Sequence, residues 1–342
     1  MENQEQRFSF TGSGSEYFRI WIVNLVLSIL TLGIYSAWAK VRRMQYFYRN
    51  TRLNESSFDY HGTAIAILKG RLIAVTLFAS YYIFIKLMPM LGLAIALLIA
   101  LSMPFLLVIS FRFRLYNSSY RGLRFGFVGS LKSTYVTFLA LPIATIFTLY
   151  LLAPFTHQRI KAFQTNNSRF GQSPFSFTAR VGNFYAIYFF AFLQFVVLAG
   201  LVGFTAYSMF KNSMANLPKE AIIGIVLVVY GLLILVTLLI VPYFIASIQN
   251  LVWNNTELGE HRFNSTMSTS GLAWIIFTNF IFIILTLGLF KPFADIRMAR
   301  YRIEHLAFIP TGSIENFIAS EQQQVGAVGT ETAEIFDLDI GF

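Results

Sequence analysis

The chain has 342 residues, of which 56% are hydrophobic, 17% are aromatic and only 12% are charged. A soluble domain carries about twice this share of charge, so a single water-soluble core is excluded and most of the chain is expected to contact lipid. The formal charge of +10 does not indicate nucleic-acid binding, because the basic residues are spread over the connectors as membrane-flanking groups. The absence of cysteine excludes disulfides and thiolate metal sites.

Long uncharged stretches alternate with charged connectors along the chain. A helix needs roughly 20 apolar residues to cross the hydrocarbon core of a membrane. The pattern therefore predicts an all-α polytopic membrane protein with about seven transmembrane helices. We expect the first helix to remain in the mature protein, because no cleavage site of small residues follows it. The seven stretches are 20–39, 72–85, 90–111, 133–155, 181–210, 221–253 and 263–290.

Five copies of one unit follow one another in the sequence. Each apolar block ends in a small residue or proline followed by an aromatic residue. In four copies an Asn-Ser or Asn-Thr pair follows, and then an alternating aromatic segment such as 58–62. We interpret the unit as a span, an interfacial amphipathic helix that begins at the proline, and a short extended aromatic segment. The blocks end at Ala37, Pro104, Pro154, Pro242 and Pro292, and the pairs begin at Asn50, Asn117, Asn167 and Asn255.

The distribution of spans over the copies predicts the domain organisation. Repeats one and two (1–124) and repeats three and four (125–262) each contain three spans, followed by a fifth partial repeat (263–312) and an acidic tail (313–342). An odd number of spans per half predicts two halves of opposite orientation, as in many transporters. Lys and Arg number eighteen on one predicted side and eight on the other, which predicts a cytoplasmic C-terminus and an N-terminus on the opposite side.

One string of residues carries a resemblance to a known family. Residues 30–42 read Leu-Thr-Leu-Gly-Ile-Tyr-Ser-Ala-Trp-Ala-Lys-Val-Arg, and Phe-x-Phe-x-Gly segments recur after the basic helices. These features resemble the YjgN-like family of bacterial inner-membrane proteins, over nearly the whole chain apart from the acidic tail. The resemblance implies a multi-pass protein of the bacterial inner membrane whose activity is unassigned.

Few polar residues lie inside the spans, and no ionisable residue lies near the middle of any span. Asn24 and Asn279 hold equivalent positions in the first and last spans, where they either form packing hydrogen bonds between helices or face a shared pathway. Arg42, Arg159 and Arg297 recur five residues after the block-ending residue. They are candidates for contacts to a lipid headgroup or another anion, and the alternative is ordinary anchoring at the interface.

No arrangement of residues predicts catalysis. The four histidines lie in separate connectors without metal-ligand spacing, and no catalytic triad order or phosphate loop is present. We therefore expect no enzyme activity, no metal and no cofactor. The expected partners are the lipid bilayer and a membrane or periplasmic protein. Inverted halves favour transport or permeation of a small or lipid-like solute, and the alternative is a non-catalytic scaffold that organises lipid or holds a partner.

Overall fold

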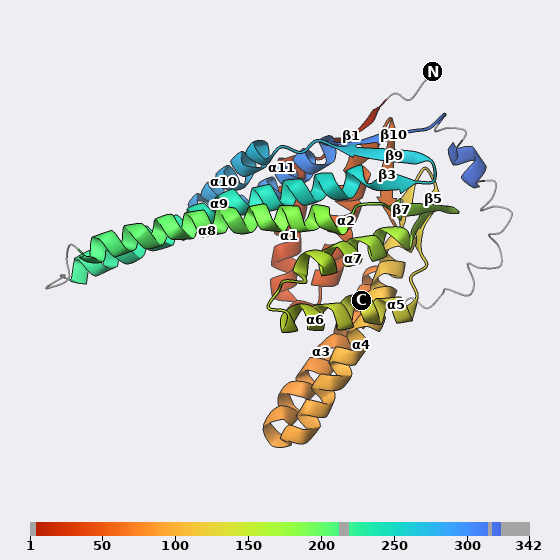
Figure 1. Cartoon of the computed structure of the whole chain (residues 1–342). Coiled ribbons are helices and arrows are strands. Elements are labelled where there is room, and N and C mark those ends of the chain that lie inside the picture. The colour runs from red at the N-terminus through yellow and green to blue at the C-terminus, as the bar shows by residue number, and fades with distance from the viewer. Residues whose placement is uncertain (1–4, 212–218, 314–316, 323–342) are drawn as a thin grey trace.

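Ten short strands close into one antiparallel barrel (Figure 1). The computed structural model describes residues 5–211, 219–313 and 317–322. The strands are β1 (Gln6–Phe10), β2 (Thr51–Leu53), β3 (Ser56–Tyr60), β4 (Ser118–Tyr120), β5 (Leu123–Phe127), β6 (Ser168–Phe170), β7 (Ser173–Phe177), β8 (Thr256–Leu258), β9 (His261–Ser265) and β10 (Leu306–Ile309). Neighbours along the chain are neighbours in the barrel, and β1 pairs with β10 to close it.

A helical hairpin connects the two strands of each unit, so the order strand, hairpin, strand occurs five times. The hairpins are α1 (Gly14–Leu30) with α2 (Ser36–Asn50); α3 (Ala64–Leu87) with α4 (Pro89–Tyr116); α5 (Leu131–Tyr135), the π-helical turn η1 (Val136–Ala140) and α6 (Leu141–Phe147) with α7 (Ala153–Asn166); α8 (Val181–Lys211) with α9 (Lys219–Asn254); and α10 (Thr269–Leu285) with α11 (Lys291–Glu304). Each second helix packs against the first helix of the next unit, and α11 packs against α1, so the helices also form a closed ring.

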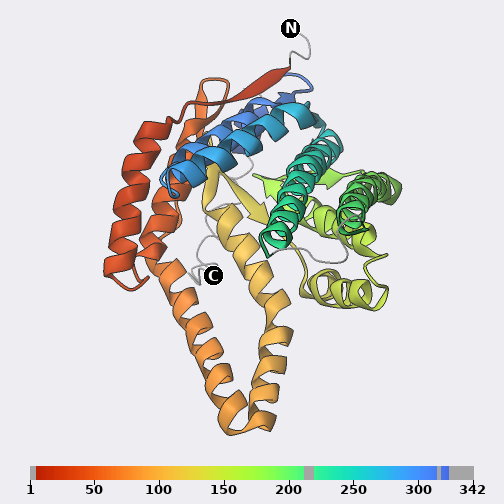
Figure 2. The same ribbon diagram turned by 90° about the vertical axis from the view of Figure 1, so that its left-hand side faces the viewer.

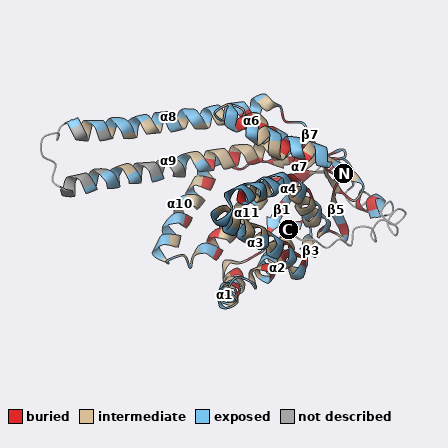
Figure 3. Cartoon of the chain, turned by 90° about the horizontal axis from the view of Figure 1, so that it is seen from below, coloured by how far each residue is buried: buried red, intermediate tan, exposed pale blue. Residues whose placement is uncertain are grey.

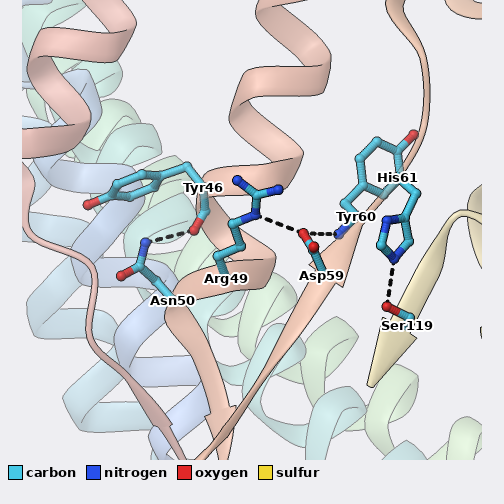
Figure 4. A network of polar contacts seen from close by, with 7 residues as sticks. All are labelled: Tyr46, Arg49, Asn50, Asp59, Tyr60, His61 and Ser119. Atoms are coloured by element: carbon cyan, nitrogen blue, oxygen red, sulfur yellow. Dashed lines mark hydrogen bonds and ion pairs between the residues drawn. The ribbon is translucent and has the colours of Figure 1, made fainter. Parts of the chain in front are cut away.

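The Asn-Ser/Thr pairs explain why helix gives way to strand at the same point of four units. The Asn50 side chain donates to the Tyr46 carbonyl at 2.8 Å, which satisfies a carbonyl that the end of α2 leaves without a helical partner (Figure 4). Thr51 Oγ1 donates to the Phe47 carbonyl in the same way, at 2.8 Å. The Asn50 carbonyl then accepts the Thr11 N–H at 2.9 Å, just beyond the end of β1. The side-chain amides of Asn117, Asn167 and Asn255 donate equivalent hydrogen bonds to the carbonyl four residues earlier.

The network in Figure 4 also joins helix α2 to strand β3. Arg49 Nε donates to Asp59 Oδ1 at 2.8 Å, and the same oxygen accepts the backbone N–H of Tyr60 at 2.8 Å. Beside them, His61 Nε2 lies 2.8 Å from Ser119 Oγ, which links β3 to β4. Burial raises the pKa of Asp59, but the bonds from Arg49 and Tyr60 outweigh it and leave that pKa below its usual value.

Aromatic and aliphatic side chains fill the barrel interior. One apolar cluster contains the paired residues of all five units. These pairs are Phe8 with Leu53, Phe58 with Tyr120, Phe125 with Phe170, Phe175 with Leu258, and Phe263 with Phe308. The first members of the pairs stack in sequence around the barrel, with ring centroids 6.1 to 6.4 Å apart. The barrel is therefore a packed core and not an open channel.

The prediction of an all-α fold with about seven transmembrane helices is wrong. Besides the barrel, only three helices in the described part of the chain are long and apolar enough to cross a membrane, namely Ala64–Leu87, Pro89–Tyr116 and Val181–Thr205. The stretches 20–39, 133–155 and 263–290 each turn back on themselves. The turns contain Leu32, Leu149 and Leu287, all with φ between 48° and 50°. Their apolar residues therefore belong to two short arms and not to one span.

The barrel also bears on the predicted inverted halves. Because β1 and β10 are adjacent strands, residues 6–10 and 306–309 lie together. Every hairpin leaves the barrel and returns to it, so two halves of opposite orientation do not arise. The predicted interfacial helices are the second arms of the hairpins. Pro154 and Pro292 begin helices as predicted, whereas Pro104 and Pro242 lie inside α4 and α9.

The hairpins expose most of their apolar surface. Buried residues gather at the barrel and at the helix ends beside it, while the long arms are exposed (Figure 3). At the tips of the short hairpins, Leu32 and Leu287 are each 95% exposed and Leu149 is 85% exposed. The long hairpins α3–α4 and α8–α9 diverge as they leave the barrel, so the ring of helices widens away from the strands (Figures 1 and 2). The predicted acidic tail lies outside the described residues except for 313 and 317–322.

Candidate anion-binding site

Five basic side chains from four of the five units lie near enough to one another to interact electrostatically. Arg114 lies close enough to both Lys40 and Lys161 to lower their pKa values, and Arg302 acts on Lys161 in the same way. The charge of Arg71 likewise lowers the pKa of Lys40. These residues come from four different units, which the closed barrel brings together. We call Lys40, Arg71, Arg114, Lys161 and Arg302 the central cationic cluster.

Two members of the cluster, Lys161 and Arg302, line a hollow. Burial lowers the pKa of Lys161 most, and the charges of Arg302 and Arg114 lower it further. Burial also lowers the pKa values of Lys40 and Arg302. Lys40, Arg114 and Arg302 nevertheless have solvent-exposed side chains.

A cavity of about 270 Å³ lies against two members of the cluster. Its walls are Lys161, Arg302 and one face of α9, including Phe244, Gln249 and Trp253. Arg302 Nε donates to Gln249 Oε1 at 2.7 Å, and Gln249 Nε2 donates back to the Arg302 carbonyl at 3.0 Å. This reciprocal pair holds the guanidinium beside the cavity and leaves its two terminal nitrogens for another acceptor.

Within the described residues, no carboxylate forms an ion pair with any member of the central cationic cluster. The ion pairs of the described chain join other residues, such as Arg49 to Asp59 and Arg43 to Asp295. Like charges held near one another repel, and an anion bound among them relieves this repulsion. A phosphate or carboxylate group with several acceptor oxygens matches such donors well.

A neutral histidine lies one helical turn before Lys161. His157 packs edge-on against Phe184 and stacks on Phe244, and its Nδ1 lies 3.1 Å from the Tyr188 hydroxyl. Burial lowers the pKa of His157 to about 4, with a smaller contribution from Lys161. The ring is therefore uncharged at neutral pH and contributes packing, not charge, to the wall of the hollow.

Two of the residues predicted from the sequence are brought together outside this cluster. Arg297 donates to Asn279 Oδ1 at 2.7 Å and to Thr278 Oγ1 at 2.9 Å. Asn279 Nδ2 also donates to the Ala294 carbonyl at 3.4 Å. Asn279 and Arg297 thus connect the two arms of the fifth hairpin.

The other predicted residues remain apart. Asn24 is buried with its Oδ1 lacking a hydrogen bond, and it is not joined to Asn279. Arg42 lies over the Tyr35 ring at 5.7 Å and lines a shallow groove that also contains Arg19 and Arg49. Arg159 is exposed over the Phe155 ring, at 5.0 Å. None of these three side chains belongs to the central cationic cluster.

The sequence missed the members of the cluster, although one signal could have found some of them. Arg114 and Arg302 both lie ten residues after the proline of their unit, and Lys161 lies seven residues after its proline, where the next unit has Gln249. Some units have a polar residue at these positions and others have an apolar one, so the positions do not form a constant motif. A comparison of the five copies by helix face would have grouped them.

The closed barrel and its hairpins define a membrane protein in which a strand core carries helical arms with exposed apolar side chains. The chain belongs to the family described as "Bacterial protein of unknown function (DUF898)", which matches residues 5–335. It is 25% identical to "Inner membrane protein YjgN" of Salmonella typhimurium, over 86% of each chain. It is also 25% identical to the protein of that name from Escherichia coli O157:H7, over 89% of each chain. No solved structure matches the chain significantly.

Proposed function

We propose that this protein is a non-catalytic scaffold of the bacterial inner membrane that binds anionic lipid headgroups in the hollow beneath its barrel. The observation that carries the proposal is the central cationic cluster, which has no paired carboxylate within the described residues. A lipid phosphate offers one negative charge and several acceptor oxygens to such a cluster. The acyl chains of the lipid would extend away from the barrel, between the apolar arms of the hairpins.

The proposed topology follows from the lengths of the hairpins. The two long hairpins cross the membrane and return: α3, α4 and α8 contain the three apolar spans of the described residues, and α9, a helix of 36 residues, returns beside α8. The three short hairpins enter the inner leaflet only. The barrel and both ends of its chain then lie in the cytoplasm, consistent with the basic residues at the barrel ends of the helices. The tips of the short hairpins suit lipid because their backbones bond internally, as when Gly33 N–H donates to the Ser28 carbonyl at 2.7 Å.

Solute transport has no comparable support. The transport hypothesis depended on two halves of opposite orientation, and the fold contains five hairpins on one barrel instead. The barrel axis is filled by the stacked phenylalanines, so a pathway through it would require the core to open. The arrangement of charges supports the second hypothesis from the sequence, a scaffold that organises lipid.

Lipid binding can be tested directly with the purified chain in nanodiscs of phosphatidylcholine containing graded amounts of phosphatidylglycerol. We expect the anionic lipid to raise the melting temperature and to remain bound in native mass spectrometry. The double variant Lys161→Gln/Arg302→Gln should weaken binding of phosphatidylglycerol at least about tenfold, the equivalent of one charge-assisted hydrogen bond. Arg7→Gln/Arg52→Gln is the matched control, because it removes the same charge from two exposed sites on the barrel strands.

Two outcomes would contradict the proposal. Equal loss of binding in both double variants would show that overall charge, and not the hollow, attracts the lipid. Movement of an anion across vesicles by the native chain, abolished in the first double variant, would favour permeation over a scaffold.

A further inference from the structure

A short C-terminal helix, residues 317–322, covers the end of the barrel opposite the hairpins. Its two apolar residues join the barrel core. The Phe317 ring packs edge-on against His261 at a centroid distance of 4.4 Å and also contacts Phe170, while Ile318 is only 5% exposed. This segment is therefore bound to the barrel mouth through apolar contacts, at the β6–β7 and β8–β9 turns.

The same segment places a carboxylate in a turn of the barrel. Glu321 is only 4% exposed. Its Oε2 accepts the backbone N–H groups of Gln172 at 2.5 Å and Ser173 at 3.3 Å, and its Oε1 accepts the Ser173 hydroxyl at 2.7 Å. Three donors from one hairpin turn thus replace the water that a buried carboxylate loses, and no basic side chain is needed.

The β6–β7 turn is shaped for this carboxylate. Gly171 has a φ of +58°, and a Cβ at this position would overlap Glu321 Oε2. The equivalent Gly122 of the β4–β5 turn has open space around its Cα, and Gly259 of the β8–β9 turn meets only Ser173 at ordinary contact distance. Among these three turns, only the β6–β7 turn is closed by a carboxylate from elsewhere in the chain.

We propose that the barrel mouth is a binding site for a short peptide, and that the chain's own residues 317–322 occupy it until a partner displaces them. The partner is a peptide segment of the same chemistry, with an aromatic residue, an aliphatic residue directly after it and a carboxylate three residues further on. Among the described residues, two apolar side chains, the Glu321 carboxylate and the Gln322 side-chain amide, which donates to the Arg121 carbonyl at 3.1 Å, hold the segment. This set of contacts is small enough for exchange. Displacement would join the cytoplasmic face of the barrel to another protein.

Exchange can be measured with a fluorescent peptide of residues 313–322 and the full-length chain in detergent. In the variant Phe317→Ala/Glu321→Ala the receptor is intact but its own segment is weakened. This variant should bind the peptide at least about tenfold more tightly than the native chain does. A peptide with Gln at the position of Glu321 should bind the same variant at least about tenfold more weakly. Equal binding to both chains, or equal binding of both peptides, would overturn the proposal.

Cysteine labelling gives a second measurement that does not depend on the double variant, because the chain has no natural cysteine. In an otherwise native chain, Ile318→Cys should react slowly with a polar maleimide, whereas Ala319→Cys should react fast because Ala319 is exposed. Addition of excess peptide should accelerate the reaction of Ile318→Cys and leave that of Ala319→Cys unchanged. Equal, peptide-independent rates at both positions would mean that the segment does not occupy the mouth, and the proposal would fail.

Discussion

Arg297 Nη1 donates to Asn279 Oδ1 at 2.7 Å, whereas Asn24, at the equivalent position of the first unit, has a buried Oδ1 without a hydrogen bond. The two asparagines should therefore respond differently to the same substitution. Asn279→Leu removes a bond to a charged group and should cost about 1.5 to 3 kcal/mol of unfolding free energy. Asn24→Leu should change it by less than about 0.5 kcal/mol, because the Asn24 Oδ1 has no hydrogen bond to lose. Thermal unfolding of both variants in detergent measures the contrast, and equal losses would contradict it.

The stacked phenylalanines of the barrel should dominate its stability. Phe125→Ala removes a ring that contacts Phe58, Phe170 and Phe175, and it should cost about 3 to 5 kcal/mol. Phe147→Ala is the control, because Phe147 is 83% exposed on a hairpin. In detergent it should cost less than about 0.5 kcal/mol. Comparable losses at both sites, measured by thermal or denaturant unfolding, would show that the barrel is not the stabilising core.

His157 should make the protein less stable in mild acid. The folded chain holds the pKa of His157 at about 4, whereas the unfolded chain has the ordinary value of 6.5. As the pH falls below 6.5, the unfolded state binds the proton first, so the free energy of unfolding decreases until the pH approaches 4. The expected loss is about 1 to 2 kcal/mol, because solvent screens the part of the ring that is not buried.

The matched variant for this effect is His157→Phe, which keeps a ring against Phe184 and Phe244. Melting temperatures of the native chain and the variant, recorded from pH 7 to pH 4, should diverge as the pH falls, with the native chain losing more stability. Parallel curves would mean that the protonation of His157 is not linked to folding.

The proposed topology predicts a simple labelling pattern in intact cells and inverted vesicles. Single cysteines at Glu55, Arg124 and Glu260, all exposed near the barrel turns, should react only from the cytoplasmic side. A cysteine at Met88, at the tip of α3–α4, should react only from the periplasmic side. A cysteine at Leu32 should react from neither side, because the tip of a short hairpin lies within the inner leaflet. Labelling of the three barrel positions from different sides would exclude the topology.

The local features of the unit were within reach of the sequence. The Asn-Ser/Thr pairs mark where helix ends and strand begins because their side chains bond the preceding turn, and that information is contained in three or four adjacent residues. The alternating Phe8 and Phe10 likewise reveal an extended segment, since successive side chains of a strand point to opposite faces. The turn at Leu32 was harder to find, because a hairpin of two apolar arms has the same composition as one long span.

The barrel and the cationic cluster could not be predicted in the same way. Pairing of β1 with β10 joins residues from the two ends of the chain, and no local pattern specifies it. The cluster depends on that closure, because its members come from units that lie far apart along the chain. Arg42, Arg159 and Arg297 were selected for constant spacing, yet constant spacing around a ring also describes residues that face outward.

Closure by β1 and β10 has a consequence for how the protein is made. At a synthesis rate of about 5 to 20 residues per second, β1 leaves the ribosome roughly 15 to 60 s before β10 exists. Throughout this interval the outer edge of β1 has no partner, although β2 already covers the other edge. An unfinished or truncated chain therefore displays a free strand edge, the feature that invites aggregation and that chaperones and proteases can use to recognise it. Completion of the last strand is thus a natural checkpoint in the biogenesis of this protein.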